Sequence, residues 1–117
     1  MQDRAVDGRR LAVLALSRGG GVLGQRLAAP LDGDFFACKG QLAAVVNRVW
    51  REYGEIVCIM ATGIVVRTIA PLLQDKYRDP AIVVCDEQGS FAVSLLSGHL
   101  GGANDLAHRV AASTGGK

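Results

Sequence analysis

Four short and almost continuous apolar runs constrain the fold of this chain more than any other feature. They occupy residues 11–16, 55–61, 81–85 and 91–96. Runs of this kind are typical of strands buried on both faces of a sheet, because a strand with one solvated face alternates apolar and polar residues. Glycine or polar residues follow each run, which indicates where each strand ends.

The segments between these runs have helical spacing or turn residues. Helices are predicted over residues 22–29, 41–53, 62–73 and 102–113, and a weaker strand over 34–38. Pro71 fits the third helix only if its last turn bends or breaks there. Gly89, within residues 86–90, predicts a hairpin turn into the run 91–96.

This alternation predicts a single three-layer α/β domain with a mostly parallel sheet of about five strands. The expected strand order is near 2-1-3-4-5, with an antiparallel last strand. Residues 11–113 form the expected domain. Residues 1–10 are expected to be a disordered or added terminus, and residues 114–117 the start of a linker to a carboxyl-terminal part.

Composition excludes several classes of protein. The 117 residues are enough for one domain with a core but too few for two. The net charge of +2 is small and its basic residues are scattered, which argues against nucleic acid as a partner. No run approaches the roughly 18 apolar residues of a membrane helix. Residues 1–10 carry five charges without an apolar core, so they are not a signal peptide, and we expect a cytoplasmic protein.

The three cysteines lie in apolar surroundings without the close spacing of a zinc site. Cys38, Cys58 and Cys85 are therefore predicted to be buried, reduced thiols. The two histidines, His99 and His108, lack a paired carboxylate motif, so no metal site is expected.

Two glycine-containing segments follow predicted strands and precede predicted helices. Residues 17–21 lack the spacing of a dinucleotide or phosphate loop, so they are either a backbone nest for an anion or a flexible turn. Thr62 and Gly63 suggest a hydroxyl N-cap followed by exposed amides that could hold an anionic group. Arg67, one turn later, would assist such a ligand or would simply be a solvated charge.

Charged residues near two other predicted turns have functional and structural interpretations. Lys76 and Arg78 could form a cationic rim for a carboxylate-rich ligand, or belong to a solvated connection. Asp86 and Glu87 end the run 81–85. One of them could act as a general base or orient His99, although acids are also common in turns.

The segment 94–105 is the most informative part of the sequence. Its apolar residues stop at Ser97, and small residues then surround His99 before a polar helix begins near Gly102. An imidazole just past a strand end lies where open α/β sheets bind ligands, but a single histidine is often structural. We expect residues 97–104 to form a tight turn beside Thr62 and Gly63, because both segments follow buried strands on what should be one sheet edge.

Several blocks of residues resemble one family closely. They are residues 60–67 (MATGIVVR), 69–73 (IAPLL), the pairs at 75–76, 83–84 and 86–87, residues 79–81 (DPA) and residues 94–104 (SLLSGHLGGAN). Together they are similar to the amino-terminal domain of the CbiG family of cobalamin biosynthesis. The resemblance is dense over residues 56–112 and thinner over 11–55, and the last block is highly specific.

The resemblance implies an enzyme of the anaerobic, cobalt-early route to the corrin ring. This enzyme hydrolyses the δ-lactone of cobalt-precorrin-5A and releases acetaldehyde, giving cobalt-precorrin-5B. The cobalt belongs to the tetrapyrrole substrate, and no further cofactor is implied. Members of the family continue into a middle segment and a carboxyl-terminal domain, which is therefore an expected partner.

Local geometry suggests roles for individual residues in such a reaction. The catalytic candidates are His99 for proton transfer, Glu87 or Asp86 as its orienting group, and Asn104 as a donor to oxyanion charge. The candidates for substrate binding are Thr62, Gly63, Arg67, Lys76, Ser97, Gly98, Gly101 and Gly102. The competing hypothesis is a non-catalytic module that binds the tetrapyrrole or docks another domain.

Overall fold

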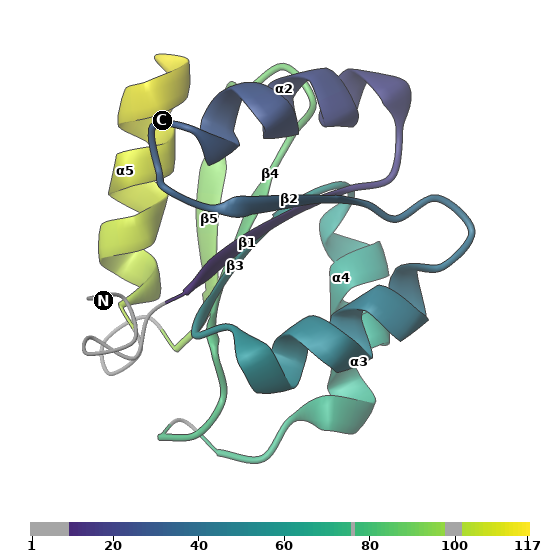
Figure 1. The fold of residues 1–117 in the computed structure, drawn as a ribbon. Helices are drawn as coiled ribbons and strands as arrows, with labels where there is room; N and C mark the ends of the chain where they lie inside the picture. Colours follow the sequence, from purple (N-terminus) through teal and green to yellow (C-terminus); the bar gives the residue numbers. More distant parts are fainter. Residues whose placement is uncertain (1–9, 76, 98–101) are drawn as a thin grey trace.

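A computed structural model describes residues 10–75, 77–97 and 102–117 (Figure 1). The strands are β1 (Leu11–Ala15), β2 (Asp34–Ala37), β3 (Glu55–Ile59), β4 (Ala81–Cys85) and β5 (Ala92–Leu96). The helices are α2 (Arg18–Ala28), α3 (Leu42–Glu52), α4 (Thr62–Ile69), α5 (Ala103–Thr114) and the 3-10 helix η1 (Ala70–Leu72). None of the helices in these residues is long and apolar enough to span a membrane.

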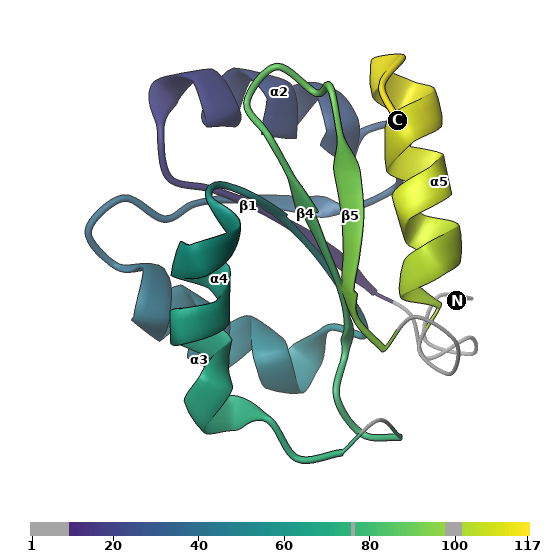
Figure 2. The same cartoon turned by 180° about the vertical axis from the view of Figure 1, so that it is seen from behind.

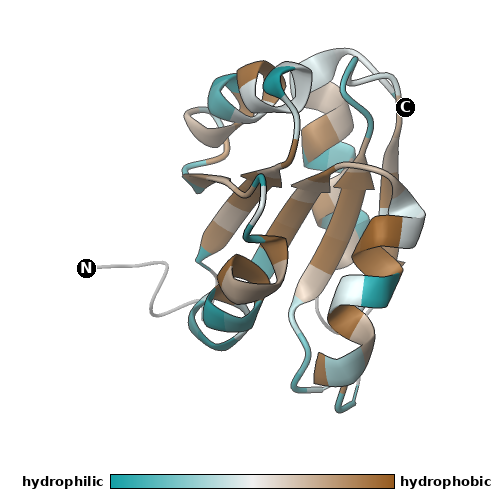
Figure 3. Cartoon of the chain, turned by 90° about the vertical axis from the view of Figure 1, so that its right-hand side faces the viewer, coloured by the Kyte–Doolittle hydropathy of each residue, from teal (hydrophilic) through white to brown (hydrophobic). Residues whose placement is uncertain are grey.

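The strands form one sheet of order β2-β1-β3-β4-β5. β1 pairs in parallel with both β2 and β3, β3 pairs in parallel with β4, and β4 pairs antiparallel with β5. The predicted class, strand order and antiparallel last strand are therefore confirmed. All residues of β1, β3 and β4 are buried, as their apolar runs predicted, and Figure 3 shows these strands as the hydrophobic centre of the fold. The same prediction is wrong for β5, which is only partly buried because it is the last strand of the sheet.

Helices cover both faces of the sheet and make the predicted three layers (Figures 1 and 2). Leu23 and Leu27 of α2 and Leu106 and Val110 of α5 pack against one set of strand side chains. Val46 and Val49 of α3 and Val65 and Ile69 of α4 pack against the opposite set. Successive strand residues point to opposite faces, so each buried strand contributes to both cores.

Helix α2 begins at Arg18, four residues before the predicted start at residue 22, so the flexible-turn interpretation of residues 17–21 is wrong and the anion-nest interpretation stays a prediction. Ser17 is the N-cap, and its hydroxyl accepts a hydrogen bond from the Gly20 amide at 3.0 Å. The glycines that suggested a loop therefore lie inside the first turns of the helix. Gly24 allows a close approach as well, since a Cβ there would lie 2.5 Å from the Phe35 ring.

The N-cap of helix α4 differs from the predicted one, whereas the helix breaks near Pro71 as predicted. Its N-cap is Ala61, without a side-chain capping bond, so Thr62 is the first helical residue and not the predicted hydroxyl cap. The α-helix ends at Ile69, and η1 follows with Pro71 inside it. This break is the one that Pro71 predicted, because proline cannot continue the α-helical hydrogen-bond ladder.

The described terminal residues are part of the folded domain. The Arg10 carbonyl accepts bonds from the amides of Gly54 and Glu55, and the Arg10 guanidinium lies 4.4 Å from the centre of the Tyr53 ring. The expectation for residues 1–9 lies outside the described residues. At the other end, α5 continues through Thr114, one residue beyond its predicted end.

The three cysteines are buried and unpaired, as predicted. Burial raises the pKa of Cys58 to about 12, with a smaller contribution from Cys38. Burial, and then the charge of Asp86, raise the pKa of Cys85 to about 11. Both thiols therefore stay protonated at neutral pH and are poor nucleophiles.

We predict that the folded domain loses stability when the pH rises above 9. Unfolded thiols ionise near pH 9, whereas the folded Cys58 thiol retains its proton until about pH 12. In this window the unfolded state binds fewer protons, so each such thiol lowers the free energy of unfolding by about 1.4 kcal/mol per pH unit. Urea denaturation between pH 7 and 11 measures this slope.

The variant Cys58→Ala is the control for this effect. Its unfolding free energy should run parallel to that of the parent between pH 7 and 8.5, and fall less steeply above pH 9. Equal slopes above pH 9 would show that Cys58 does not carry the effect.

Candidate functional site

The candidate site residues that the structure describes lie at two opposite edges of the sheet. The carboxyl edge is where β1, β3 and β4 end. The amino edge is where these three strands begin. Because β5 is antiparallel to β4, the end of β5 lies at the amino edge, and the Ser97 hydroxyl donates to the carbonyl of Asp79, just before β4, at 3.2 Å.

The expectation that residues 97–104 face Thr62 and Gly63 is therefore wrong for the described part of that segment. Thr62 and Gly63 follow β3 at the carboxyl edge, whereas Ser97 and Gly102 lie at the amino edge. The physical reason is strand direction: two segments that both follow strands share an edge only if the strands are parallel.

A hydrogen bond between Ser17 and Glu87 organises the carboxyl edge. The Ser17 hydroxyl donates to Oε2 of Glu87 at 2.6 Å, although Ser17 follows β1 and Glu87 follows β4. The bond thus passes over the end of β3, which lies between these two strands in the sheet. Gly19 leaves room for the carboxylate, since a Cβ at that position would lie 2.6 Å from Oε1 of Glu87.

The Ser17 hydroxyl has two roles in this arrangement. It accepts from the Gly20 amide while it donates to Glu87, so it links the amino end of α2 to a carboxylate. The partial positive charge at a helix start favours a nearby anion. Sequence reasoning selected Glu87 but missed Ser17 as its partner; the available signal was a serine in N-cap position directly after a buried strand.

Arg67 and Gly63 are brought together as predicted. The Arg67 guanidinium lies over Gly63, with its nitrogens 3.6 and 3.7 Å from where a Gly63 Cβ would be. Thr62, Gly63 and Arg67 are all exposed. This surface therefore offers a cation and the start of a helix to an anionic group.

Asp86 has a structural role in the hairpin. Its Oδ1 accepts from the Phe91 amide at 2.9 Å, and its carbonyl accepts from the Gly89 amide at 3.0 Å. Gly89 has a φ of 72°, as the predicted turn requires. Asp86 thus closes the turn, which agrees with the alternative that it is one of the acids common in turns.

At the amino edge, the two ends of the predicted tight turn meet. The Ala103 amide donates to the Ser97 carbonyl at 3.1 Å, and both Ser97 and Gly102 have left-handed backbones, with φ of 61° and 85°. Asn104 is exposed in the first turn of α5. The remaining predicted residues lie outside the described residues; they are Lys76, Gly98, His99 and Gly101.

An ion-pair group that the sequence did not suggest lies on the same edge. Glu55, at the start of β3, is buried, and its Oε2 lies 2.8 Å from Nη2 of Arg109 on α5. Nε of Arg109 lies 3.2 Å from Oδ2 of Asp105. The group attaches α5 to the sheet; only the four-residue spacing of Asp105 and Arg109 was visible in the sequence.

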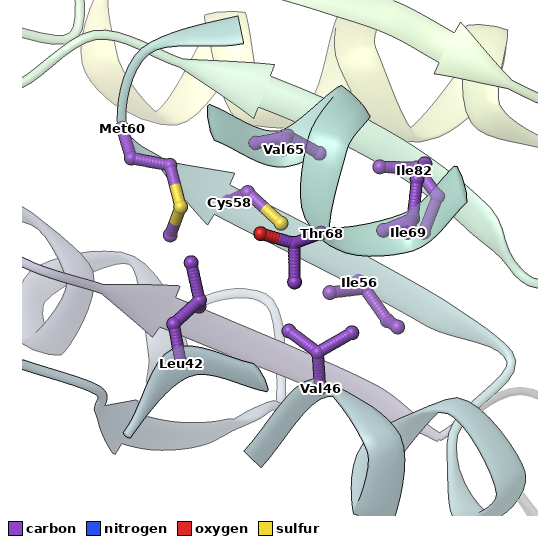
Figure 4. A pocket seen from close by; sticks show the side chains of 9 residues that line it. All are labelled: Leu42, Val46, Ile56, Cys58, Met60, Val65, Thr68, Ile69 and Ile82. Carbon is purple, nitrogen blue, oxygen red and sulfur yellow. The ribbon is translucent and has the colours of Figure 1, made fainter. Parts of the chain in front are cut away.

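A cavity between α3, α4 and the sheet is too small for the expected substrate (Figure 4). Its volume is about 10 Å³, which is about the space of one water molecule. The hydroxyl of Thr68, the one polar side chain that lines it, donates to the Ile64 carbonyl. We interpret the cavity as imperfect packing.

The described residues contain no group of three or more His, Cys, Asp or Glu side chains that could hold a metal ion.

The fold and the carboxyl-edge geometry define an α/β domain of the doubly wound class, with helix starts at the point where the strand order reverses. Comparison with known families is more specific. Residues 44–117 match the family described as Cobalamin synthesis G N-terminal, so the chain belongs to this family.

Two curated relatives carry the same name. The chain is 40% identical over 116 residues to the cobalt-precorrin-5A hydrolase of Salmonella typhimurium, covering 90% of this chain and 33% of that protein. It is 45% identical over 75 residues to the cobalt-precorrin-5A hydrolase of Priestia megaterium, covering 64% of this chain and 20% of that protein. The chain thus spans about a third or less of these relatives.

A solved structure supports the fold. A cobalamin biosynthesis protein G homologue from Sulfolobus solfataricus superimposes with a TM-score of 0.78 at 24% identity. The similarity covers 93% of this chain and 35% of that chain.

We predict that Ser17→Ala lowers the free energy of unfolding by about 1 kcal/mol, the usual effect of losing an N-cap side chain. A double-mutant cycle with Glu87→Gln measures the interaction energy between the two side chains. Residues in one hydrogen-bonded network usually have an interaction energy of at least about 0.5 kcal/mol. Urea denaturation supplies the four free energies. Ser113→Ala, at an exposed serine near the end of α5, is the matched control and should change little. Additive effects of the two changes would contradict the Ser17–Glu87 link.

Proposed function

We propose that the full-length protein hydrolyses the δ-lactone of cobalt-precorrin-5A and releases acetaldehyde to give cobalt-precorrin-5B. The observation that carries this proposal is the 40% identity to a cobalt-precorrin-5A hydrolase across nine-tenths of the chain. Membership of the Cobalamin synthesis G N-terminal family supports the same pathway.

The reaction requires a base, an acid and donors to negative charge. Water adds to the lactone carbonyl and loses a proton, and the leaving alkoxide gains one. The alcohol then loses its hydroxyl proton as the carbon–carbon bond breaks, which releases acetaldehyde, and the electron pair that stays on the macrocycle is protonated. Positioned side chains are needed for these proton transfers, and amide or cationic donors for the developing oxyanion.

The carboxyl edge is suited to the acidic arms of a tetrapyrrole. Arg67 supplies a cation directly over Gly63, and the exposed start of α4 supplies backbone donors beside Thr62. The start of α4 lies at the carboxyl edge near the point between β1 and β3 where the strand order reverses, and open α/β sheets usually bind ligands there. We assign carboxylate binding to Thr62, Gly63 and Arg67.

The remaining candidates concern proton transfer and further contacts to the substrate. His99 is our candidate for the acid or base, with Asn104 as a donor to the oxyanion. Ser97 and Gly102, which lie at the amino edge, would supply polar contacts and amides, and Gly98, Gly101 and Lys76 are further candidates for substrate binding. Glu87 and Asp86 lie at the carboxyl edge, where they are bonded to Ser17 and to the hairpin backbone. They remain candidates for proton transfer there, and the positions of the described residues do not support a role in orienting His99.

The proposal extends to cofactors and partners. The cobalt is carried by the substrate, and the protein needs no cofactor of its own. A carboxyl-terminal domain of the same protein completes the enzyme, which acts in the cytoplasm without nucleic acid or membrane partners.

We predict that His99→Ala in the full-length protein lowers acetaldehyde release by about a hundredfold or more, the usual effect of removing a general acid or base. Acetaldehyde is measured anaerobically with cobalt-precorrin-5A as substrate. His108→Ala is the matched control, because His108 is the other histidine of this chain and is exposed on α5.

Three outcomes decide between the hypotheses. Loss of release in His99→Ala with normal release in His108→Ala supports catalysis by His99. If both variants release acetaldehyde as fast as the parent, and the parent binds the substrate, the result favours a domain that binds or docks without catalysing. Absence of acetaldehyde from the parent itself would contradict the proposed function.

A further inference from the structure

The backbone of Lys117 lies against the outer edge of β5. The Lys117 amide donates to the Ser90 carbonyl at 2.9 Å, and the Lys117 carbonyl accepts from the Ala92 amide at 2.9 Å. Lys117 therefore bonds to both neighbours of Phe91, and this is the hydrogen-bond pattern of parallel strands. Lys117 is therefore in register with Phe91, and its chain direction is that of β5.

The rest of β5 continues this edge. β5 is the last strand in the sheet, and its other side pairs with β4. Because hydrogen-bonding direction alternates along a strand, the amide of Ser94 points to the same side as that of Ala92. The edge also has apolar side chains beside it: Phe91 is 59% exposed and Val93 is 47% exposed.

The end of α5 is shaped to deliver the chain to this edge. Gly115 has a φ of 80°, and the amides of Gly115 and Gly116 both donate to the Ala111 carbonyl. A Cβ on Gly116 would clash with the Gly89 carbonyl oxygen, so glycine is required for this close approach. Residues 115–117 thus follow the end of the helix closely and bring the chain to the sheet, at the point where the start of a linker was expected.

The position of α5 fits a right-handed connection. β5 runs opposite to β1, β3 and β4, so a right-handed return to its outer edge needs a helix on the face that α2 covers. α5 packs on that face together with α2. Strand β5, helix α5 and Lys117 therefore have the geometry of a β-α-β unit whose second strand begins at Lys117.

We propose that the outer edge of β5 binds the extended segment that directly follows Lys117 in the full-length polypeptide, as a sixth strand parallel to β5. The occupant is indicated by Lys117, whose backbone already lies on the edge in the correct direction and register. This strand would extend the sheet and attach the remainder of the enzyme to this domain. An edge strand left open would instead be free to pair with other chains.

Disulfide trapping in the full-length protein tests the register. Cysteine at the second residue after Lys117 should form a disulfide with Val93→Cys under mild oxidation, because paired strand residues lie within disulfide reach. The matched control places the cysteine at the third residue after Lys117, which points to the opposite face of the strand and should not react. The buried Cys38, Cys58 and Cys85 are protonated and should stay reduced.

Hydrogen exchange of the unaltered full-length protein provides a second measurement that does not depend on a variant folding. The Ser94 amide should exchange at least about a hundredfold more slowly than an unprotected amide. Equal trapping in both cysteine pairs, or free exchange at Ser94, would overturn the proposal. A dimer linked through Val93→Cys alone would overturn it as well, since a second copy would then occupy the edge.

Discussion

The antiparallel pairing of β4 with β5 is the constraint on which the arrangement of this domain depends. It brings the end of β5 to the amino edge, where Ser97 bonds to the carbonyl of Asp79. It also sets the course of α5, which returns along the α2 face and brings Lys117 beside Phe91. Reversing this one strand would move the segment after Ser97 to the other edge of the sheet.

The consequence for function is that two polar surfaces lie at opposite edges of one small domain. At the carboxyl edge, Ser17 holds Glu87 and Arg67 lies over Gly63. At the amino edge, the Ala103 amide donates to the Ser97 carbonyl, so Ser97 and Gly102 lie close together. The candidate ligand-binding groups of the described residues are therefore divided between two edges of the sheet and do not form a single cluster.

Much of the fold could be predicted from local patterns, because buried strands, helix spacing and Pro71 have local causes. The start of α2 could not, because the glycines of residues 19–21 resemble a loop until Ser17 is known to cap the helix. The edge of the Ser97 segment was predicted wrongly although the direction of β5 was predicted correctly. Contacts between residues distant in sequence, such as Glu55 with Arg109, have no local pattern at all. Local patterns thus selected candidate residues but not their spatial arrangement.

The most direct test of this account is the distance between the two edges in solution. Spin labels on Thr62→Cys and Asn104→Cys, both exposed positions, allow that distance to be measured by pulsed electron resonance. A strand rises about 3.3 Å per residue, so labels at opposite ends of the sheet should lie roughly 20 Å or more apart. A distance of about 10 Å or less would place both segments at one edge and contradict the arrangement described here.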